Sequence, residues 1–515
     1  MKKKLLYAGF LMAVSLCLAS CGDHGSSVSS ETNTSRTESR ISSAETASTD
    51  IRQDQTEEAG QDKPGQTEEA DYLDALFDTS YVHDVKVEIS EEDWADLLAN
   101  AVDKPKYNIK ISIDGESYED VRFSTKGSSS LYLVAGRIKN NRYSFKLRFD
   151  YKDKEQTYHG LREISLNNSY KDYSYLRDYA AALAFRTVGV DPAAMSFTRL
   201  YINGDYYGLY MAEENIGQEY LDRNYGGEGL LYKPESEVVN GCNKSVKSAV
   251  KEYLASGSQD PLKLDLVKLD PNYTTKGADL KYSDDDPENY SDIFKNDIIE
   301  VTDQDQEELI SALKHLSEGE IDEAIDREEV LRYFAAHNFV CNSDGYTGTA
   351  LHNYLLYENN GLLAMVPWDY NLSAMPSALR PVTGSNGENS MEELVNQGLD
   401  TPTFEEVKAE NRPMLNWIYQ DEDAYETYEQ VMTDELAAYF ESDAFTEEMQ
   451  RVHDLIQPWV ERDPTAFCSA EEFEEEYENL LAFYQKRSQS IRKQVAGDLS
   501  KNTADQEQED RISWE

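Results

Sequence analysis

The chain has 515 residues, with 49 Lys and Arg against 99 Asp and Glu, so its formal net charge at pH 7 is −50. This charge argues against nucleic acid as a partner, because nucleic-acid binding needs a basic face. It also argues against docking on anionic lipid headgroups. Cys242, Cys341 and Cys468 are too few and too far apart for a disulfide framework or a zinc site, so we expect three thiols.

The first residues predict a lipoprotein signal peptide over residues 1–20. Met1 to Lys4 is basic, and Leu5 to Leu18 is apolar but too short to span a bilayer. The small residues before Cys21 resemble a lipobox, in which that cysteine is lipidated. The alternative is an ordinary signal peptide that contains a cysteine. We therefore expect an exported protein that a lipid on Cys21 anchors to the outer face of a membrane.

Residues 21–70 are expected to form a disordered, acidic, Ser/Thr-rich tether. Residues 22–70 contain no Phe, Trp or Tyr and are rich in Ser, Thr, Glu and Gln. Such a segment cannot bury enough apolar surface to fold. It would hold the folded part of the chain away from the membrane.

From about residue 71, the pattern predicts strands joined by tight turns. Apolar residues alternate with polar ones at 85–89, 109–113, 118–123, 143–149, 200–202 and 206–211. Asp114-Gly115 and Asn203-Gly204 are two-residue hairpin signals. A capping box at Ser90 begins a short helix, and residues 174–188 predict a longer one.

The later part of the chain is expected to be helical. Residues 240–300 show no clear periodicity, and helical patterns begin near residue 302. Ser469 and Glu472 form a capping box for a final helix, whose apolar face carries Phe473, Tyr477, Leu480 and Tyr484. We expect an α+β fold: a domain over 71–400 with a mixed or antiparallel sheet, a helical region over 401–497 that packs on or extends it, and a polar tail over 498–515.

Three stretches in the sheet region offer phosphate-contacting candidates. Lys126-Gly127-Ser128 begins a Ser-rich loop whose backbone N–H groups can form an anion-binding nest, and the alternative is an ordinary turn. Lys146 lies on the polar face of the strand 143–149, which faces either solvent or a cleft. Glu214 ends a predicted strand, where it either caps the next helix or pairs with a buried lysine.

Three oxygen-bearing side chains lie close together in the sequence: Asp344, Asn353 and Asp369. Magnesium prefers one or two carboxylates together with waters and substrate phosphates. One Asp and one Asn for the ion, with one Asp to orient an attacking hydroxyl, make a minimal phosphoryl-transfer set. The alternative is a turn at Asp344, a strand-edge amide at Asn353 and a cap at Asp369.

An ordered set of motifs resembles the spore-coat protein H (CotH) kinase family. Its core comprises Asn342-Ser-Asp344, His352-Asn353-Tyr354-Leu-Leu-Tyr357 and Pro367-Trp-Asp369. The upstream landmarks follow in the same order: Lys126 to Ser130, Ser144-Phe-Lys146, Leu176-Arg177, Tyr201 to Gly204, Gly208-Leu-Tyr210, Glu214 and Leu231-Tyr-Lys233. The resemblance covers roughly residues 80–375. The chain departs from the family at Lys126 and Ser128, where Arg and Asn are usual, so a bidentate Arg contact is lost. It also departs at Asn371, where a second Asp is frequent.

The resemblance implies an atypical protein kinase with a divergent protein-kinase-like core that transfers the γ-phosphate of ATP to Ser or Thr. Asp344 would be catalytic, and Asp369 would bind Mg²⁺ or Mn²⁺, with Asn353 as a second ligand. Lys146, paired with Glu214, would contact the phosphates, and Lys233 competes for this role. The Lys126-Gly127-Ser128 loop would cover the phosphates.

Two functions from different classes follow from these expectations. The first is a kinase outside the cytoplasm that phosphorylates secreted or cell-surface proteins, with its own tether among the candidate substrates. The second is a non-catalytic protein with a kinase-like fold that binds or assembles at the cell envelope or on an extracellular polymer. The intact Asp344, Asn353 and Asp369 favour the first function, whereas the expected location favours the second.

Overall fold

The computed structural model describes residues 72–138, 140–257, 262, 273–375, 390–404 and 407–514. The expected signal peptide, Cys21 and the whole tether lie outside the described residues. All described residues fall in the same compact unit, which extends to the last residue of the chain. Among them, no helix has both the length and the apolar character needed to cross a membrane.

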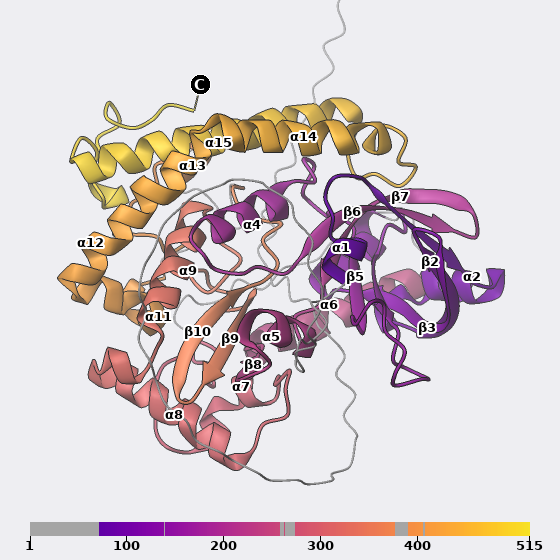
Figure 1. Ribbon diagram of the computed structural model, residues 1–515, viewed down its shortest axis with the longest axis horizontal. Coiled ribbons are helices and arrows are strands. Elements are labelled where there is room, and N and C mark those ends of the chain that lie inside the picture. The colour runs from indigo at the N-terminus through magenta and orange to yellow at the C-terminus, as the bar shows by residue number, and fades with distance from the viewer. Residues whose placement is uncertain are drawn as a thin grey trace, which may run out of the picture. The chain divides into compact units, whose positions relative to one another are not determined.

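The first half of this unit is built on a closed barrel of seven strands in the order β1-β2-β3-β4-β5-β7-β6 (Figure 1). Neighbouring strands are antiparallel except where β1 and β6 close the barrel in parallel. The strands are β1 His83–Glu88, β2 Tyr107–Ile113, β3 Glu116–Lys126, β4 Ser144–Arg148, β5 Glu163–Asn167, β6 Met195–Ile202 and β7 Asp205–Glu214.

Both predicted two-residue turns are present in the barrel. Asp114 and Gly115 have φ of 48° and 98°, and Asn203 and Gly204 have φ of 51° and 93°. Positive φ at both central residues is the geometry that Asn-Gly and Asp-Gly favour, since it matches the twist of paired strands. Alternate side chains of the strands point inward, where Val87, Ile111, Phe123, Phe145, Leu147 and Leu166 form part of the core.

The second half combines a three-stranded antiparallel sheet with helices. The sheet has the order β10-β9-β8, with β8 Leu230–Tyr232, β9 Tyr354–Asn359 and β10 Leu362–Pro367. The helices before residue 400 are α1 Tyr72–Leu76, α2 Glu91–Ala99, α3 Ser129–Leu133, α4 Arg177–Thr187, α5 Gln218–Tyr225, α6 Glu237–Ala255, α7 Ser291–Phe294, α8 Asp303–Glu318, α9 Arg327–Phe339 and α10 Ser390–Val395. Later helices are α11 Pro413–Asn416, α12 Glu422–Gln430, α13 Ala438–Phe440, α14 Asp443–Val460 and α15 Ala470–Ala496.

The last two long helices contact both halves of the unit, and in Figure 1 they run along its upper edge. On the barrel side, Arg142 donates to Asp463, which lies between α14 and α15, at 2.6 Å. On the helical side, Arg177 of α4 donates to Glu476 of α15 at 2.6 Å. The C-terminal helices are therefore packed on the core.

The structure confirms the predicted α+β class, with a mixed sheet first and helices later, while the kinase-like core remains a prediction. The caps at Ser90 and Ser469 are present, and Ser469 and Glu472 make the expected reciprocal capping box. Two features were not predicted. The strands close into a barrel, and α6 occupies part of the segment that lacks periodicity. Only Val239, Asn243, Val250 and Tyr253 of α6 are buried, so its apolar stripe is sparse.

Candidate functional site

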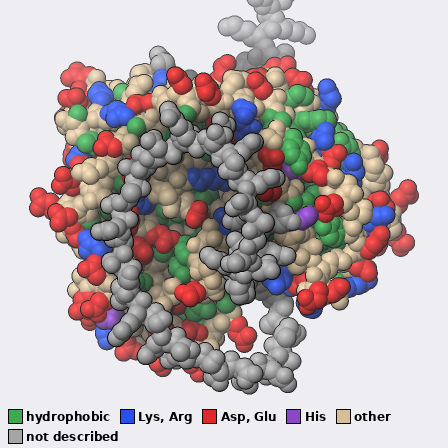
Figure 2. All heavy atoms as spheres, viewed as in Figure 1, with side chains coloured by type: hydrophobic (Ala, Val, Ile, Leu, Met, Phe, Trp, Pro, Cys, Tyr) green, Lys and Arg blue, Asp and Glu red, His purple; other side chains and the backbone are tan. Residues whose placement is uncertain are grey.

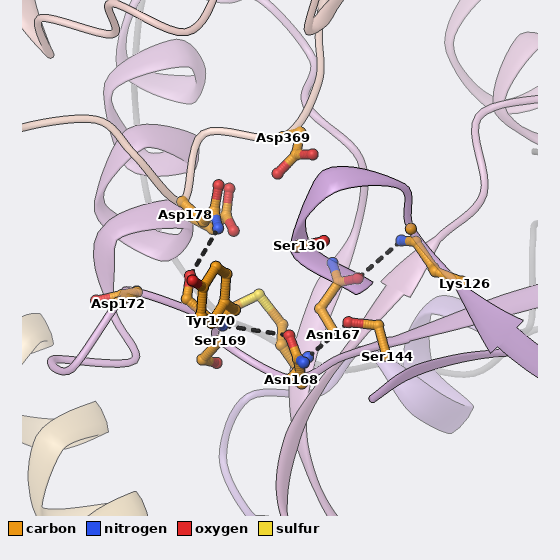
Figure 3. A pocket seen from close by; sticks show the side chains of 13 residues that line it. Lys126, Ser130, Ser144, Asn167, Asn168, Ser169, Tyr170, Asp172, Asp178 and Asp369 are labelled. Carbon is orange, nitrogen blue, oxygen red and sulfur yellow. Dashed lines mark hydrogen bonds between the residues drawn. The ribbon is translucent and has the colours of Figure 1, made fainter. Parts of the chain in front are cut away.

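A polar pocket lies where the outer face of the barrel meets the start of α4 and the segment after β10 (Figure 3). Strands β3, β4, β5 and β7 each contribute a side chain, and the segments after β5 and β10 complete the wall. The lining residues are Lys126, Gly127, Ser130, Ser144, Asn167, Asn168, Ser169, Tyr170, Asp172, Asp178, Met211, Asp369 and Asn371. Carboxylates, amides and a lysine therefore converge from both halves of the unit.

The barrel side of the pocket is organised around Lys126. Its Nζ donates to Asn167 Oδ1 at 2.7 Å and lies 3.5 Å from Glu213 Oε2. Asn167 Nδ2 in turn donates to the same Glu213 oxygen at 2.6 Å, so the amide bridges the lysine and the glutamate. Burial lowers the pKa of Lys126, against the opposing effects of Glu213 and Asp369. Lys146 and Lys233 also lie near enough to lower that pKa.

The Trp368 ring lies near two of these lysines. The Nζ atoms of Lys126 and Lys233 are 5.4 Å and 5.7 Å from the Trp368 ring centroid, within the range of a cation–π contact. On the face shown in Figure 2, Lys and Arg side chains lie near the centre beside acidic ones, and both kinds also occur along the margin. Lys126, Lys146 and Lys233 lie near one another, which suits contact with a phosphate chain, although the pocket wall also carries Asp172, Asp178 and Asp369.

Asp369 faces these lysines from the segment that follows β10. Its φ is 59°, in the left-handed region that Asp tolerates better than most residues. Burial raises the pKa of Asp369 to about 6, and the nearby carboxylates of Glu213 and Asp344 add to the shift. Within the described chain its carboxylate has no hydrogen bond and no ion pair. Asp369 is only partly exposed, and the ionised form of such a carboxylate is costly unless a cation compensates its charge.

Asp344, His352 and Asn353 form a buried group on the loop between α9 and β9. Asn353 Nδ2 donates to Asp344 Oδ2 at 3.0 Å, and His352 Nε2 lies 3.4 Å from Asp344 Oδ1. Burial lowers the pKa of His352, but the carboxylates of Asp344, Asp369 and Glu235 together outweigh that effect, so the net shift is upward. Asn353 Oδ1 is buried and has no hydrogen bond within the described part of the chain.

The loop that carries this group has a tightly constrained backbone. Leu351 and Asn353 have φ of 51° and 56°, and a left-handed leucine is strained. A Cβ on Gly348 would lie 2.0 Å from the Ser343 carbonyl oxygen, so the loop accepts only glycine there. Strain held by close packing is frequent at functional sites.

One predicted pairing is wrong. Lys146 forms its ion pair with Glu163 at 2.6 Å, and Glu214 pairs with Arg223 at 2.7 Å. Glu213, not Glu214, reaches toward the pocket, because successive residues of a strand point to opposite faces. The pair that the structure forms in this place is Lys126 with Glu213.

The remaining predicted residues occupy several positions around the pocket. Lys126 and Gly127 line it, and Gly127 has a φ of 98°, whereas Ser128 is buried and does not line it. Lys233 lies 3.5 Å from Glu235 as well as over Trp368. Sequence reasoning missed Asn167, Asp178 and Glu213. Of these three, only Glu213 could have been found from the sequence pattern. It lies two residues from Met211, which lines the pocket, and residues two apart on a strand share a face.

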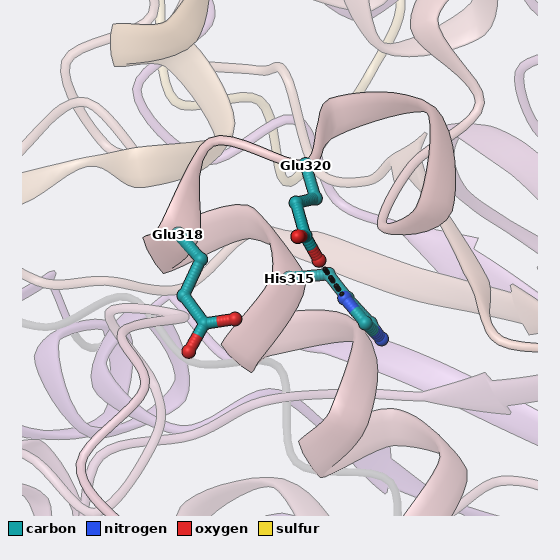
Figure 4. A group of neighbouring side chains, drawn as sticks. All are labelled: His315, Glu318 and Glu320. Carbon is teal, nitrogen blue, oxygen red and sulfur yellow. Dashed lines mark hydrogen bonds and ion pairs between the residues drawn. The ribbon is translucent and has the colours of Figure 1, made fainter.

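A second group of possible metal ligands lies on the surface at the end of α8. His315, Glu318 and Glu320 bring one ligand atom each within 4.8 Å of one another, and no other group of His, Cys, Asp or Glu side chains in the described ranges does so (Figure 4). Both glutamates are exposed, and Glu320 Oε2 already lies 2.6 Å from His315 Nδ1. Exposed acidic clusters of this kind are common without a metal, so this group does not define a site.

Comparison with known proteins identifies the family. The family model described as CotH kinase protein matches residues 123–491. The chain is also similar to the inner spore coat protein H of Bacillus subtilis (strain 168), with 22% identity over 340 residues, which cover 65% of this chain and 79% of that protein. The matched region contains the pocket, the Asp344 loop and most of the C-terminal helices. The chain therefore belongs to the CotH kinase family.

Proposed function

We propose that this protein is an atypical kinase outside the cytoplasm that transfers the γ-phosphate of ATP to Ser or Thr of secreted or cell-surface proteins. The observation that supports this most is the pocket that Lys126 and Asp369 both line, with Lys146 and Lys233 near enough to Lys126 to lower its pKa. Family membership supports an ATP-dependent kinase. The similarity to an inner spore coat protein supports a substrate within a coat or envelope assembly.

The residues present fit a divalent cation that accompanies ATP. Among the described residues, Asp369 forms no ion pair, although Lys126 and His352 lie near enough to lower its pKa, and Asn353 Oδ1 is buried without a hydrogen bond. An oxygen from each, completed by waters and phosphate oxygens, is the ligand set that Mg²⁺ or Mn²⁺ takes in nucleotide sites. Bound there, the cation would neutralise charge on the phosphates.

The chain's own side chains have three roles in this proposal. Lys126 contacts a phosphate oxygen, and the bridge from Asn167 to Glu213 fixes its ammonium group toward the pocket. Asp344 accepts the proton of the substrate hydroxyl while the hydroxyl oxygen bonds to the γ-phosphorus. The bond between the γ-phosphorus and the oxygen that it shares with the β-phosphate breaks, and ADP leaves. Asn353, which donates to Asp344 Oδ2, holds that carboxylate in one orientation.

The test is phosphate incorporation measured by mass spectrometry. The chain from residue 22 is incubated with ATP and Mg²⁺ or Mn²⁺, beside the variants Asp344→Ala and Asp369→Ala. Phosphoserine or phosphothreonine is expected in the wild type, in its own tether or in an added surface protein, and not in either variant. If no phosphate is transferred and no nucleotide binds with either metal, the protein is a non-catalytic binding or assembly protein with this fold.

A further inference from the structure

Asp178, in the first turn of α4, is a buried carboxylate that the proposed mechanism does not use. Its side chain is 9% exposed and lines the same pocket as Asp369. The backbone N–H of Tyr370 donates to Asp178 Oδ1 at 2.6 Å. This bond fixes Asp178 against the residue that directly follows Asp369, although the two carboxylates are far apart in the sequence.

The charges around Asp178 are negative. After burial, which contributes most, the carboxylates of Glu213, Asp369 and Asp172 raise its pKa well above the usual range. Two of these neighbours have basic partners: Glu213 has Lys126, and Asp172 has Arg177 at 3.6 Å. Among the described residues, Asp178 forms no ion pair with a basic side chain. The ionised form of a buried carboxylate is unfavourable in this setting, so Asp178 is either protonated or paired with a cation from outside the chain.

The geometry of the pocket shows where that cation would bind. In Figure 3, Asp178 on α4 and Asp369 on the segment after β10 face the same open space. Asn371 also lines this space, and its Nδ2 donates a hydrogen bond to the Tyr170 carbonyl oxygen at 3.2 Å. Magnesium and manganese ions are commonly held by one or two carboxylates, with waters and phosphates in the remaining positions.

We propose that Asp178 is a second carboxylate ligand of the divalent cation at Asp369, so that one Mg²⁺ or Mn²⁺ joins α4 to the segment after β10. The inference rests on the proposed function, since it names a further residue of the same cation site. It predicts that cation binding tightens the contact between Asp178 and the Tyr370 backbone. Asp178→Asn would lower the affinity for the cation. It would leave the fold intact, because the Asn side chain keeps an oxygen that accepts the backbone N–H of Tyr370.

The first experiment titrates Mn²⁺ into the protein without nucleotide and with a non-hydrolysable ATP analogue, followed by electron paramagnetic resonance. Asp178→Asn is expected to weaken Mn²⁺ binding by roughly 10- to 100-fold. Asp292→Asn is the matched control, because Asp292 is also buried and accepts backbone N–H groups, from Lys276 and Glu237. It should leave the Mn²⁺ affinity unchanged. Equal affinity in Asp178→Asn and wild type would overturn the inference.

A second experiment uses the wild-type chain and so does not depend on how any variant folds. Fe²⁺ that replaces the cation in its site cleaves the neighbouring backbone when dioxygen is present as oxidant and ascorbate regenerates Fe²⁺, and the fragments are identified by mass spectrometry. Cleavage near both Asp178 and Asp369 is expected, and cleavage near Asp369 alone would contradict a shared ion, as would the absence of any Mn²⁺ binding.

The outcomes also separate this inference from the proposed kinase function. Mn²⁺ binding that depends on Asp178, without phosphate transfer, would leave the cation site standing and reject the kinase. Phosphate transfer at wild-type level in Asp178→Asn would support the kinase and reject Asp178 as a ligand of its cation.

Discussion

The contact between Arg142 and Asp463 is expected to be one of the strongest determinants of stability. Both side chains are fully buried, and Arg142 Nη1 lies 2.6 Å from Asp463 Oδ2. Asp463 also accepts the backbone N–H groups of Leu209 and Thr465, each at 2.8 Å. The pair therefore joins the segment between α14 and α15 to strand β7 of the barrel.

Asp463→Ala would leave the guanidinium of Arg142 buried without a counter-charge. Loss of one partner of a buried ion pair typically costs about 3–5 kcal/mol. For a unit that spans residues 70–515, the entropy of unfolding is about 0.9 kcal/mol/K, so the melting temperature should fall by about 3–5 °C. Because Arg142 Nε also donates to the Asn168 carbonyl at 2.9 Å, and Asn168 lines the pocket, nucleotide binding should weaken as well.

Differential scanning calorimetry of the wild type and Asp463→Ala measures this effect. Glu410→Ala serves as the control, because Glu410 belongs to an exposed ion pair with Lys408 at 3.4 Å. Exposed pairs contribute at most about 1 kcal/mol, so the control should melt within about 1 °C of the wild type. A shift as small as the control's in Asp463→Ala would refute the reasoning.

Gly208 provides an independent perturbation of the same contact. A Cβ at Gly208 would lie 2.5 Å from Arg142 Nη1 and 2.7 Å from Asp463 Oδ1, too close for either atom to remain in place. Gly208→Ala should therefore lower the melting temperature, whereas Gly241→Ala, with nothing within 4 Å of the added carbon, should not. Similar melting temperatures for the two variants would mean that Arg142 and Asp463 can move apart from the added carbon at little cost in stability.

Three further predictions concern the pocket and the core around it. Lys126→Met should lower kcat/KM for phosphate transfer by roughly 10²–10³-fold, whereas Lys146→Met should retain most activity, because Glu163 already holds that lysine; the reverse result would restore Lys146 as the phosphate contact. Asn353→Ala should weaken Mn²⁺ binding in the titration described above, and an unchanged affinity would exclude Asn353 as a ligand. Burial lowers the pKa of His337 to about 3, so its contribution to stability is complete above pH 6.5 and is lost as the pH falls from 6.5 toward 3. His337→Gln should therefore show a shallower fall in urea midpoint over this range, and an equal slope would contradict the assignment.

The local sequence was sufficient for the elements whose signals are contained within a few residues. Asp114-Gly115 and Asn203-Gly204 specify their hairpins because their residue types accept positive φ. Ser469 specifies the start of α15 because its side chain meets an N–H group three residues later. The motifs around Asp344 and Asp369 likewise lie on short segments, and they were sufficient to indicate the family.

The tertiary structure alone decided which side chains meet in the pocket. Lys126 and Glu213 are brought together by the register of the intervening strands β4 and β5, and an error of one residue in that register selects Glu214 instead. Asp178 lines the same pocket as Asp369 and accepts from the Tyr370 backbone only because α4 packs beside the segment that follows β10. Contacts of this kind depend on how distant elements are packed, and residue patterns carry no direct record of that packing. The sequence therefore determined the elements and the family, and the fold determined the partners of each charged side chain.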